Sequence, residues 1–252
     1  MNSISANLNI MIKASEKASK ILIRDFGEVE KLQVSVKGPA DFVTNADKKA
    51  EKIIINELKK ARKNFSILSE ESGSTEGKDN NNVWIIDPID GTNNFLHGIP
   101  HFSISIALKS NNEIISGVVY DPIKDEMFYA EKNNGAFVNN KRIRVSKRKN
   151  LDDCLFGCSG DYAETFNKKI KNKLTIRSSG SAALDMAYVA SGRYDAFFQK
   201  KLNLWDIAAG VIIVKEAGGQ VSDFNFNEHN NINMLAANSS LNDKLIKNII
   251  NF

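Results

Sequence analysis

Residues 84–95 read WIIDPIDGTNNF, an apolar run that ends in two aspartates and is followed by Gly-Thr. Asp87 and Asp90 supply the hard carboxylate oxygens that Mg²⁺ prefers, and Pro88 biases Asp87 toward an extended backbone. Gly91 lets the backbone approach a ligand closely, and a helix that begins there points its free N–H groups at a phosphate. An ordinary strand-to-helix turn uses the same residue types. The stretch indicates a metal-assisted phosphatase and leaves a plain turn as the alternative.

Other segments of the chain carry a family resemblance. Residues 87–95 resemble the signature of the inositol monophosphatase family, and residues 204–210, LWDIAAG, resemble its second signature. The resemblance also covers residues 41–47, 69–72 and 177–183, so it extends over essentially the whole chain. It implies an α/β (α+β) fold, the layered αβαβα sandwich shared with fructose-1,6-bisphosphatases.

Composition is that of an ordinary soluble globular protein. The chain has 252 residues, 42% hydrophobic and 25% charged, with a net charge of +4 that is too small to indicate nucleic-acid binding by itself. The N-terminus lacks a signal-peptide pattern, and the longest apolar run, near residues 207–214, is far shorter than a membrane span. We therefore expect a cytoplasmic protein with no membrane contact. Cys154 and Cys158 are expected to be reduced, partly buried thiols rather than a disulfide or zinc site.

Periodicity predicts the order of elements along one domain, residues 1–252. Helices are expected at residues 5–26 and 47–63, then strands at 65–68 and 83–87, a meander of strands at 102–108, 114–120 and 126–130, and a hairpin at 136–138 and 143–145. Further strands are expected near 155 and at 174–177, 196–198 and 233–237, with helices at 181–191 and 206–217 and a final helix. A large antiparallel sheet in the N-terminal half and a smaller mixed sheet in the C-terminal half follow from this order.

Carboxylates at the predicted element ends form the candidate metal site. Convergence of several acidic side chains is costly without cations, because buried carboxylates either gain protons or need a metal. The resemblance implies that Glu70, Asp87 and the backbone carbonyl of Ile89 hold a first Mg²⁺, and that Asp87, Asp90 and Asp206 hold a second. It leaves open a third, weaker site near Glu70. Taken alone, Asp206 is also a good helix N-cap, and Glu70 a plain loop carboxylate.

The resemblance also assigns a reaction, the hydrolysis of a phosphate monoester by a metal-activated water. Glu70 and Thr92 would orient the water, and Asp47 would form a hydrogen bond with Thr92. Backbone N–H groups of Gly91 and Thr92 would bind the phosphate. The alternatives are a helix cap for Thr92 and a helix-start carboxylate for Asp47. The implied substrate-binding residues are Gly91, Thr92, Ala182, Gln199 and Asp206.

The sequence is compatible with several substrates. Gln199 stands where the family usually has a glutamate that accepts hydrogen bonds from ring hydroxyls, and Lys200 and Lys201 follow it. These lysines favour a more anionic substrate if they face the pocket, and form a solvated loop if they do not. Inositol 1-phosphate is the first candidate. The alternatives are fructose 1,6-bisphosphate, histidinol phosphate and nucleotide bisphosphates. The resemblance further implies a homodimer and inhibition by lithium.

A basic run supports a non-enzymatic alternative. Residues 141–149 read KRIRVSKRK, with six basic residues in nine. Some bacterial relatives are implicated in transcription complexes, so an RNA-associated or transcription-associated regulatory protein is the competing class. No aromatic residue interrupts the run, which argues against a base-stacking platform. A basic strand edge that resists aggregation is the simpler interpretation.

Overall fold

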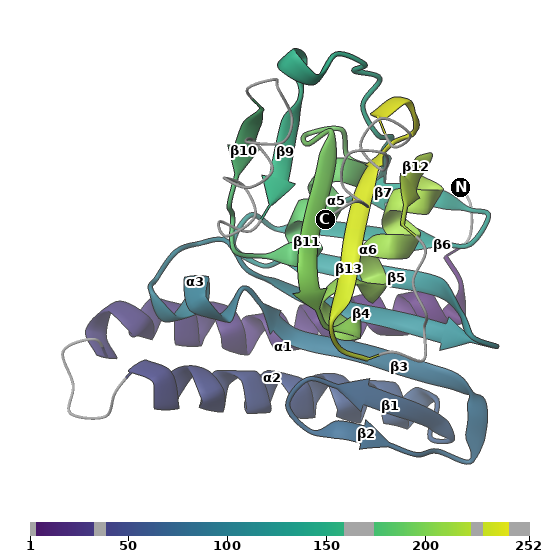
Figure 1. Ribbon diagram of the computed structural model, residues 1–252. Helices are drawn as coiled ribbons and strands as arrows, with labels where there is room; N and C mark the ends of the chain where they lie inside the picture. Colours follow the sequence, from purple (N-terminus) through teal and green to yellow (C-terminus); the bar gives the residue numbers. More distant parts are fainter. Residues whose placement is uncertain (1–3, 33–38, 159–173, 223–228, 242–252) are drawn as a thin grey trace.

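Layers of helices and sheets alternate in the computed structural model, which describes residues 4–32, 39–158, 174–222 and 229–241 (Figure 1). The first layer is a pair of long helices, α1 (Ala6–Leu32) and α2 (Pro39–Ala61), which pack on each other and on one face of a large sheet. Among the helices that are described, none combines the length and apolar character needed to cross a bilayer.

The large sheet has eight strands and forms the second layer. In spatial order they are β2 (Gly73–Thr75), β1 (Phe65–Ser69), β3 (Asp79–Asp90), β4 (Ser103–Ser110), β5 (Glu113–Asp121), β6 (Glu126–Glu131), β7 (Gly135–Val138) and β8 (Lys141–Arg142). Neighbours are antiparallel except β1 and β3, which are parallel. The predicted meander is β4 to β6. The short helix α3 (Thr92–Leu96) follows β3 directly, where the sequence predicted a helix start.

Two apolar helices, α5 (Ala182–Ala190) and α6 (Leu204–Glu216), lie between the large sheet and a smaller one. The smaller sheet has the spatial order β10 (Thr175–Arg177), β9 (Leu155–Cys158), β11 (Ala196–Leu202), β13 (Ile232–Asn238) and β12 (Gly219–Val221). A short 3₁₀ helix, η1 (Leu151–Asp153), comes before β9 in the chain. It is mixed, because β9 is parallel to β10 and β11 whereas β13 is antiparallel to β11 and β12.

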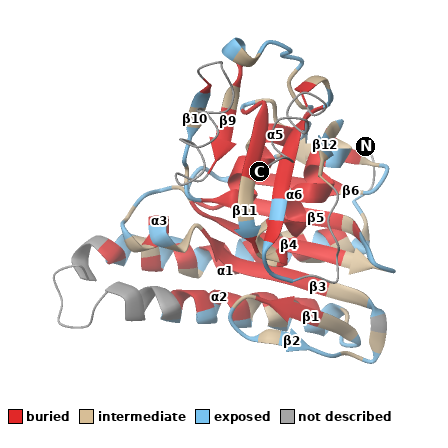
Figure 2. Ribbon diagram, in the orientation of Figure 1, coloured by how far each residue is buried: buried red, intermediate tan, exposed pale blue. Residues whose placement is uncertain are grey.

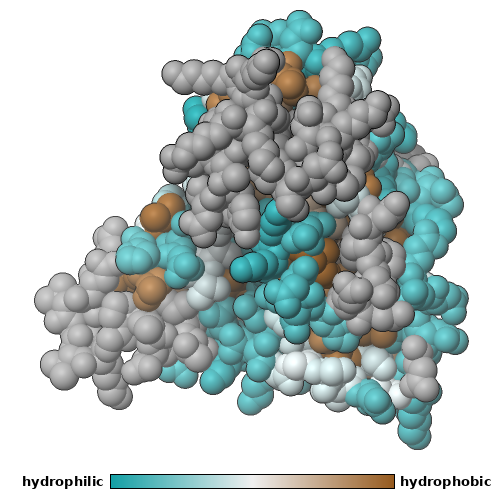
Figure 3. All heavy atoms as spheres, in the orientation of Figure 1, coloured by the Kyte–Doolittle hydropathy of each residue, from teal (hydrophilic) through white to brown (hydrophobic). Residues whose placement is uncertain are grey.

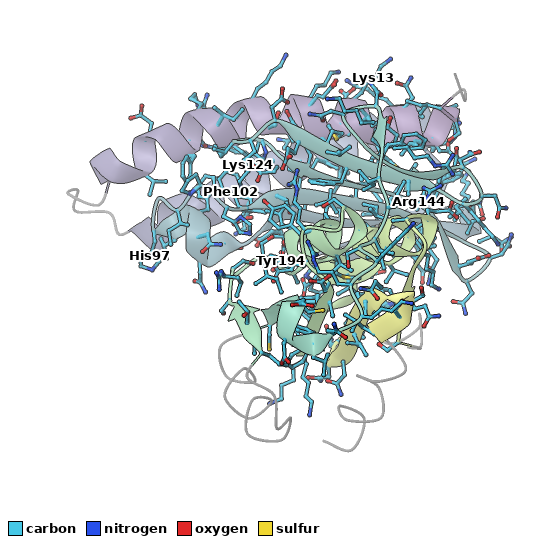
Figure 4. All side chains as sticks on the ribbon, turned by 90° about the horizontal axis from the view of Figure 1, so that it is seen from above. Lys13, His97, Phe102, Lys124, Arg144 and Tyr194 are labelled. Atoms are coloured by element: carbon cyan, nitrogen blue, oxygen red, sulfur yellow. The ribbon has the colours of Figure 1, made fainter. Side chains whose placement is uncertain are left out.

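The view from above separates the long helices from α5 and α6 on opposite sides of the large sheet (Figure 4). Most residues of α5, α6 and the strands beside them are buried (Figure 2). The layered α/β fold class is therefore confirmed. The final predicted helix follows the strand predicted at residues 233–237, and residues 242–252 lie outside the described part. The single-domain assignment of residues 1–252 stays a prediction.

Two predicted boundaries are wrong for physical reasons. Helix α2 begins at Pro39, eight residues before the predicted start, since proline fits the first turn of a helix, where its missing N–H is not needed. The strand predicted at residues 143–145 lies earlier, as β8, and after it Ile143 N still donates to the carbonyl of Ala136 in β7 at 2.9 Å. Val145 N instead donates to the carbonyl of Ala217 at 3.2 Å, so the chain turns from the sheet toward the end of α6.

Close packing of α6 on the large sheet depends on a glycine. A Cβ at Gly117 of β5 would lie 2.7 Å from Cγ2 of Ile212 and 2.8 Å from the carbonyl oxygen of Ala209. Both partners belong to α6, and one of them is backbone. The helix can therefore lie this near the strand only where the side chain is absent.

Gly117→Ala should lower the free energy of unfolding by about 1–3 kcal/mol, because α6 must move away from β5. Urea denaturation of the purified variant measures this. Gly27→Ala is the matched control, since Gly27 is exposed on α1 and an added Cβ meets nothing within 4 Å. That control should be neutral or up to about 1 kcal/mol more stable. Equal stability of Gly117→Ala and the wild type would refute the packing argument.

Candidate active site

A bulge in β3 sets the directions of the two motif aspartates. Asp87 pairs with Ser105 and Asp90 with Ser103, so three residue steps on β3 match two on β4. Pro88 has no N–H to give the ladder, which is why the irregularity falls there. The carboxylate of Asp87 accepts a hydrogen bond from Ile89 N at 3.0 Å, which closes the turn. The predicted Asx-type turn is therefore present, and it shapes the strand end that carries both carboxylates.

Asp90 joins this strand end to the start of α5. Its carboxylate accepts hydrogen bonds from the Ser181 hydroxyl and from the backbone N–H groups of Ala182 (3.2 Å) and Ala183 (3.0 Å). An anion is favoured at a helix N-terminus, where free amides converge. Burial raises the pKa of Asp90 to about 6, although these hydrogen bonds act in the opposite direction. Since a carboxylate offers about four lone pairs, capacity remains for a further partner.

Asp206 comes from the start of α6, but not as its N-cap. The N-cap is Asn203, and Asp206 is the third residue of the helix, so the N-cap assignment is wrong by three positions. Its carboxylate accepts a hydrogen bond from Asn203 N at 2.8 Å. Burial raises the pKa of Asp206 to about 7, with further contributions from the charges of Asp90 and Glu70.

The four predicted carboxylates meet at one pocket. Burial, together with the charges of Glu70, Asp90 and Asp206, holds the pKa of Asp87 well above its ordinary value. Burial likewise raises the pKa of Glu70, which follows β1. The pocket has a volume of ≈ 270 Å³ and is lined by Glu70, Asp87, Ile89, Asp90, Gly91, Thr92, Cys158, Ser178, Gly180, Ala182, Asp185, Gln199, Leu202, Asn203 and Asp206.

The donor set fits a hard divalent cation. No lysine, arginine or histidine is among the described lining residues, so the acidic side chains have no cationic partner there. Like-charged buried carboxylates without a cation are unfavourable, and oxygen donors are those that Mg²⁺ and similar ions bind. Within the described ranges, no three His, Cys, Asp or Glu side chains lie close enough together to hold a metal ion as they stand. The four carboxylates nonetheless line the same pocket.

Thr92 and Asp47 differ in their placement. Thr92 lines the pocket, and its hydroxyl donates to the carbonyl of Ile89 at 2.9 Å. Asp47 is not among the described lining residues and lies in the middle of α2 rather than at a helix start. Burial, with the charges of Glu71, Glu70 and Glu51, raises its pKa to about 8. Among the residues described, its Oδ1 has no hydrogen-bond partner. The Asp47–Thr92 hydrogen bond therefore stays a prediction.

The predicted substrate residues line the same pocket. Gly91 is the N-cap of α3 with φ 95°, a left-handed conformation that favours glycine, and a Cβ there would lie 3.1 Å from the carbonyl of His101. Ala182 and Gln199 also face the pocket, whereas Lys200 and Lys201 are not among its lining residues. Their substrate-binding roles stay predictions.

Two residues of this region were missed by the sequence analysis. Asn94 is buried and donates from Nδ2 to the carbonyls of His101 (2.7 Å) and Ser179 (2.8 Å), which joins α3 to the loop before α5. Asp185 lines the pocket and accepts a hydrogen bond from the Ser179 hydroxyl at 2.6 Å, and burial raises its pKa to about 8. Asn94 lies inside the quoted stretch, which was the available signal. The sequence gives no signal for Asp185 except that it lies on the first turn of a predicted apolar helix.

Comparison with known proteins gives consistent matches. The model of the inositol monophosphatase family matches residues 5–251. The inositol-1-monophosphatase of Mesorhizobium japonicum is 46% identical, over 96% of this chain and 96% of that protein. The Nus factor SuhB of Pasteurella multocida is 42% identical, over 86% of this chain and 85% of its own. The solved structure of the extragenic suppressor protein suhB from Bartonella henselae has a TM-score of 0.87 and 47% identity, over 96% of this chain and 98% of that one.

Proposed function

The chain belongs to the inositol monophosphatase family, a family of phosphoric monoester hydrolases, and we propose that it hydrolyses inositol 1-phosphate in a Mg²⁺-dependent reaction. The observation that carries the proposal is the pocket where Glu70, Asp87, Asp90 and Asp206 converge beside the Gly91–Thr92 helix start, with no basic side chain among its described lining. A phosphate ester can enter such an acidic pocket only if cations accompany it.

The proposed metal ligands follow the sequence prediction. Glu70, Asp87 and the carbonyl oxygen of Ile89 would hold one Mg²⁺, and Asp87, Asp90 and Asp206 a second, with a third, weaker site near Glu70 left to titration experiments. The Ile89 carbonyl already accepts the Thr92 hydroxyl, and its second lone pair remains for an ion. When bound, the ions neutralise phosphate charge and make the attacking water more acidic.

The protein's own groups would position the reactants. Glu70 and Thr92 hold the water in line with the phosphorus, and Asp47 supports Thr92 from behind. The water gives up one proton to solvent as its oxygen forms a bond to phosphorus, the bond from phosphorus to the alcohol oxygen breaks, and the alkoxide takes one proton from solvent. Backbone N–H groups of Gly91 and Thr92 bind the phosphate. Ala182, Gln199 and Asp206, which line the same pocket, would contact the alcohol.

The relatives named Nus factor SuhB support a second candidate function, association with RNA or transcription proteins. The basic segment offers less free charge than its sequence suggests, since Arg148 pairs with the buried Asp195 at 3.0 Å. Lys141, Lys147 and Lys149 are exposed. Phosphate release that requires Mg²⁺ supports the enzyme, whereas nucleic-acid binding that weakens steeply with salt supports the binding protein. The homodimer also stays a prediction, for light scattering to decide.

Asp87→Asn should lower kcat for inositol 1-phosphate by about a hundredfold or more, because the site loses a charged ligand shared between both proposed ions. Phosphate release at millimolar Mg²⁺ measures this, with circular dichroism to show that the fold persists. Asp152→Asn is the matched control, since Asp152 is exposed on η1 and should retain full activity. Near-normal turnover of Asp87→Asn at saturating Mg²⁺ would remove the basis of the proposal.

Gln199→Glu should shift substrate preference. A carboxylate at this pocket position strengthens hydrogen bonds to ring hydroxyls of inositol 1-phosphate and repels the second phosphate of fructose 1,6-bisphosphate. A charged hydrogen bond contributes about 1.5–3 kcal/mol, so the ratio of the two kcat/KM values should change roughly tenfold or more. Both substrates are measured at saturating Mg²⁺. An unchanged ratio would mean that residue 199 does not contact the alcohol.

A further inference from the structure

A second pocket lies on the large sheet and shares no lining residue with the catalytic pocket. Its volume is ≈ 290 Å³. The floor is apolar and consists of Leu68, Val83 and Ile85, and the rim is polar. In Figure 3 some brown apolar surface is visible over β1 and β3, bordered by white and teal residues. The pocket therefore combines a flat apolar base with hydrogen-bonding groups around it.

Strand register places the two pockets on the same face of the sheet. Side chains alternate along a strand, so Leu68 shares a face with Glu70, and Ile85 shares a face with Asp87. Leu68 and Ile85 are direct partners across the β1–β3 pair. Two residues of strand span about 7 Å, so the second pocket begins one side-chain repeat from the catalytic carboxylates. It is a separate neighbour and not part of the site described above.

Lys109 gives the second pocket an anion-binding group. It pairs with Val83 across β3 and β4, which directs its side chain to the pocket face. Burial lowers the pKa of its ammonium group. Within the described ranges its side-chain ammonium group makes no hydrogen bond or ion pair. His229 lies at the rim, where its carbonyl accepts from Leu204 N at 2.9 Å and so fixes its backbone next to α6.

The opposite side of the pocket carries groups suited to hydroxyls. Ser74 pairs with Leu68 across β1 and β2, so its hydroxyl rises from the same face. Ser66 Oγ accepts a hydrogen bond from Gly77 N at 2.9 Å, which leaves its O–H free to donate. Glu76 is exposed at the rim and makes no ion pair with Lys109 in the described structure. These three residues supply donors and acceptors, and the apolar floor supplies a surface for a carbon ring or chain.

We propose that this second pocket binds a small hydroxylated anion, a phosphorylated or carboxylated polyol, with its anionic group at Lys109 and its hydroxyls toward Ser74 and Glu76. Lys109 and His229 supply the hydrogen-bond donors for the anion. The residues involved are distinct from every proposed metal ligand. The site therefore does not depend on catalysis or on Mg²⁺.

Isothermal titration calorimetry of the metal-free protein in EDTA tests this, with glucose 6-phosphate and gluconate as separate probes. Without cations, the acidic catalytic pocket repels anions and turns over nothing, so binding there is suppressed. At least one probe should bind at one molecule per chain, and which probe binds identifies the anionic group. Lys109→Met should weaken binding about tenfold or more, whereas Lys109→Arg should retain it. Glu76→Gln should weaken binding severalfold, because a neutral amide oxygen accepts hydrogen bonds from the ligand's hydroxyls less strongly than a carboxylate does.

Lys13→Met is the matched control, since Lys13 is exposed on α1, on the far side of the sheet (Figure 4). Its affinity for the probe should equal that of the wild type. Thermal unfolding shows whether Lys109→Met remains folded. Absence of heat with both probes, or affinity unaffected by Lys109→Met, would overturn the proposal. Binding that is strengthened in Asp87→Asn and unaffected by Lys109→Met would place the anion in the catalytic pocket instead.

Discussion

Repulsion among carboxylates that are held together out of water is the constraint around which this protein is arranged. Glu70 follows β1, Asp87 and Asp90 belong to β3, and Asp206 belongs to α6. Each of the four has a raised pKa of which burial is the first cause. Burying one charge without a partner is already costly, and several like charges cost more. Such a cluster persists in a folded protein only if the rest of the structure holds it there, and a cation removes most of the cost.

The layers supply that support through the starts of two helices. Both α5 and α6 begin at the pocket, where Ser181, Ala182 and Ala183 donate to Asp90, and Asn203 donates to Asp206. The helices are held against each other and against the sheet by close contacts at small residues. A Cβ at Gly210 of α6 would lie 2.7 Å from Cβ of Met186 in α5. Gly117 of β5 allows an equally close contact between α6 and the large sheet. Packing this close leaves the carboxylates little freedom to separate.

Local sequence patterns predicted the helices and strands, but they could not predict contacts between residues far apart in the chain. The run before Asp87, the proline and Gly91 predicted a strand end followed by a helix start, because these signals depend on neighbours in sequence. The prediction that the four carboxylates converge rested on the family resemblance, because no sequence periodicity connects Asp206 with Asp87. Asn94 was missed for the same reason, since one of its two acceptors is 85 residues away. The strand predicted at 143–145 was misplaced because the partner of Val145 is the end of α6, which its own alternation does not reveal. The second pocket could not be predicted from the sequence, because recognising it requires the register of four paired strands.

The carboxylate cluster destabilises the fold, and cations relieve this cost. Free energies of unfolding from urea denaturation, with EDTA and with saturating Mg²⁺, test it directly in the wild type and in Asp87→Asn. In EDTA, Asp87→Asn should be more stable than the wild type, because one buried like charge is gone. Mg²⁺ should stabilise the wild type by about 2–3 kcal/mol at a hundredfold excess over its Kd, and the variant much less. A variant that is less stable in EDTA and gains as much from Mg²⁺ as the wild type would contradict the account.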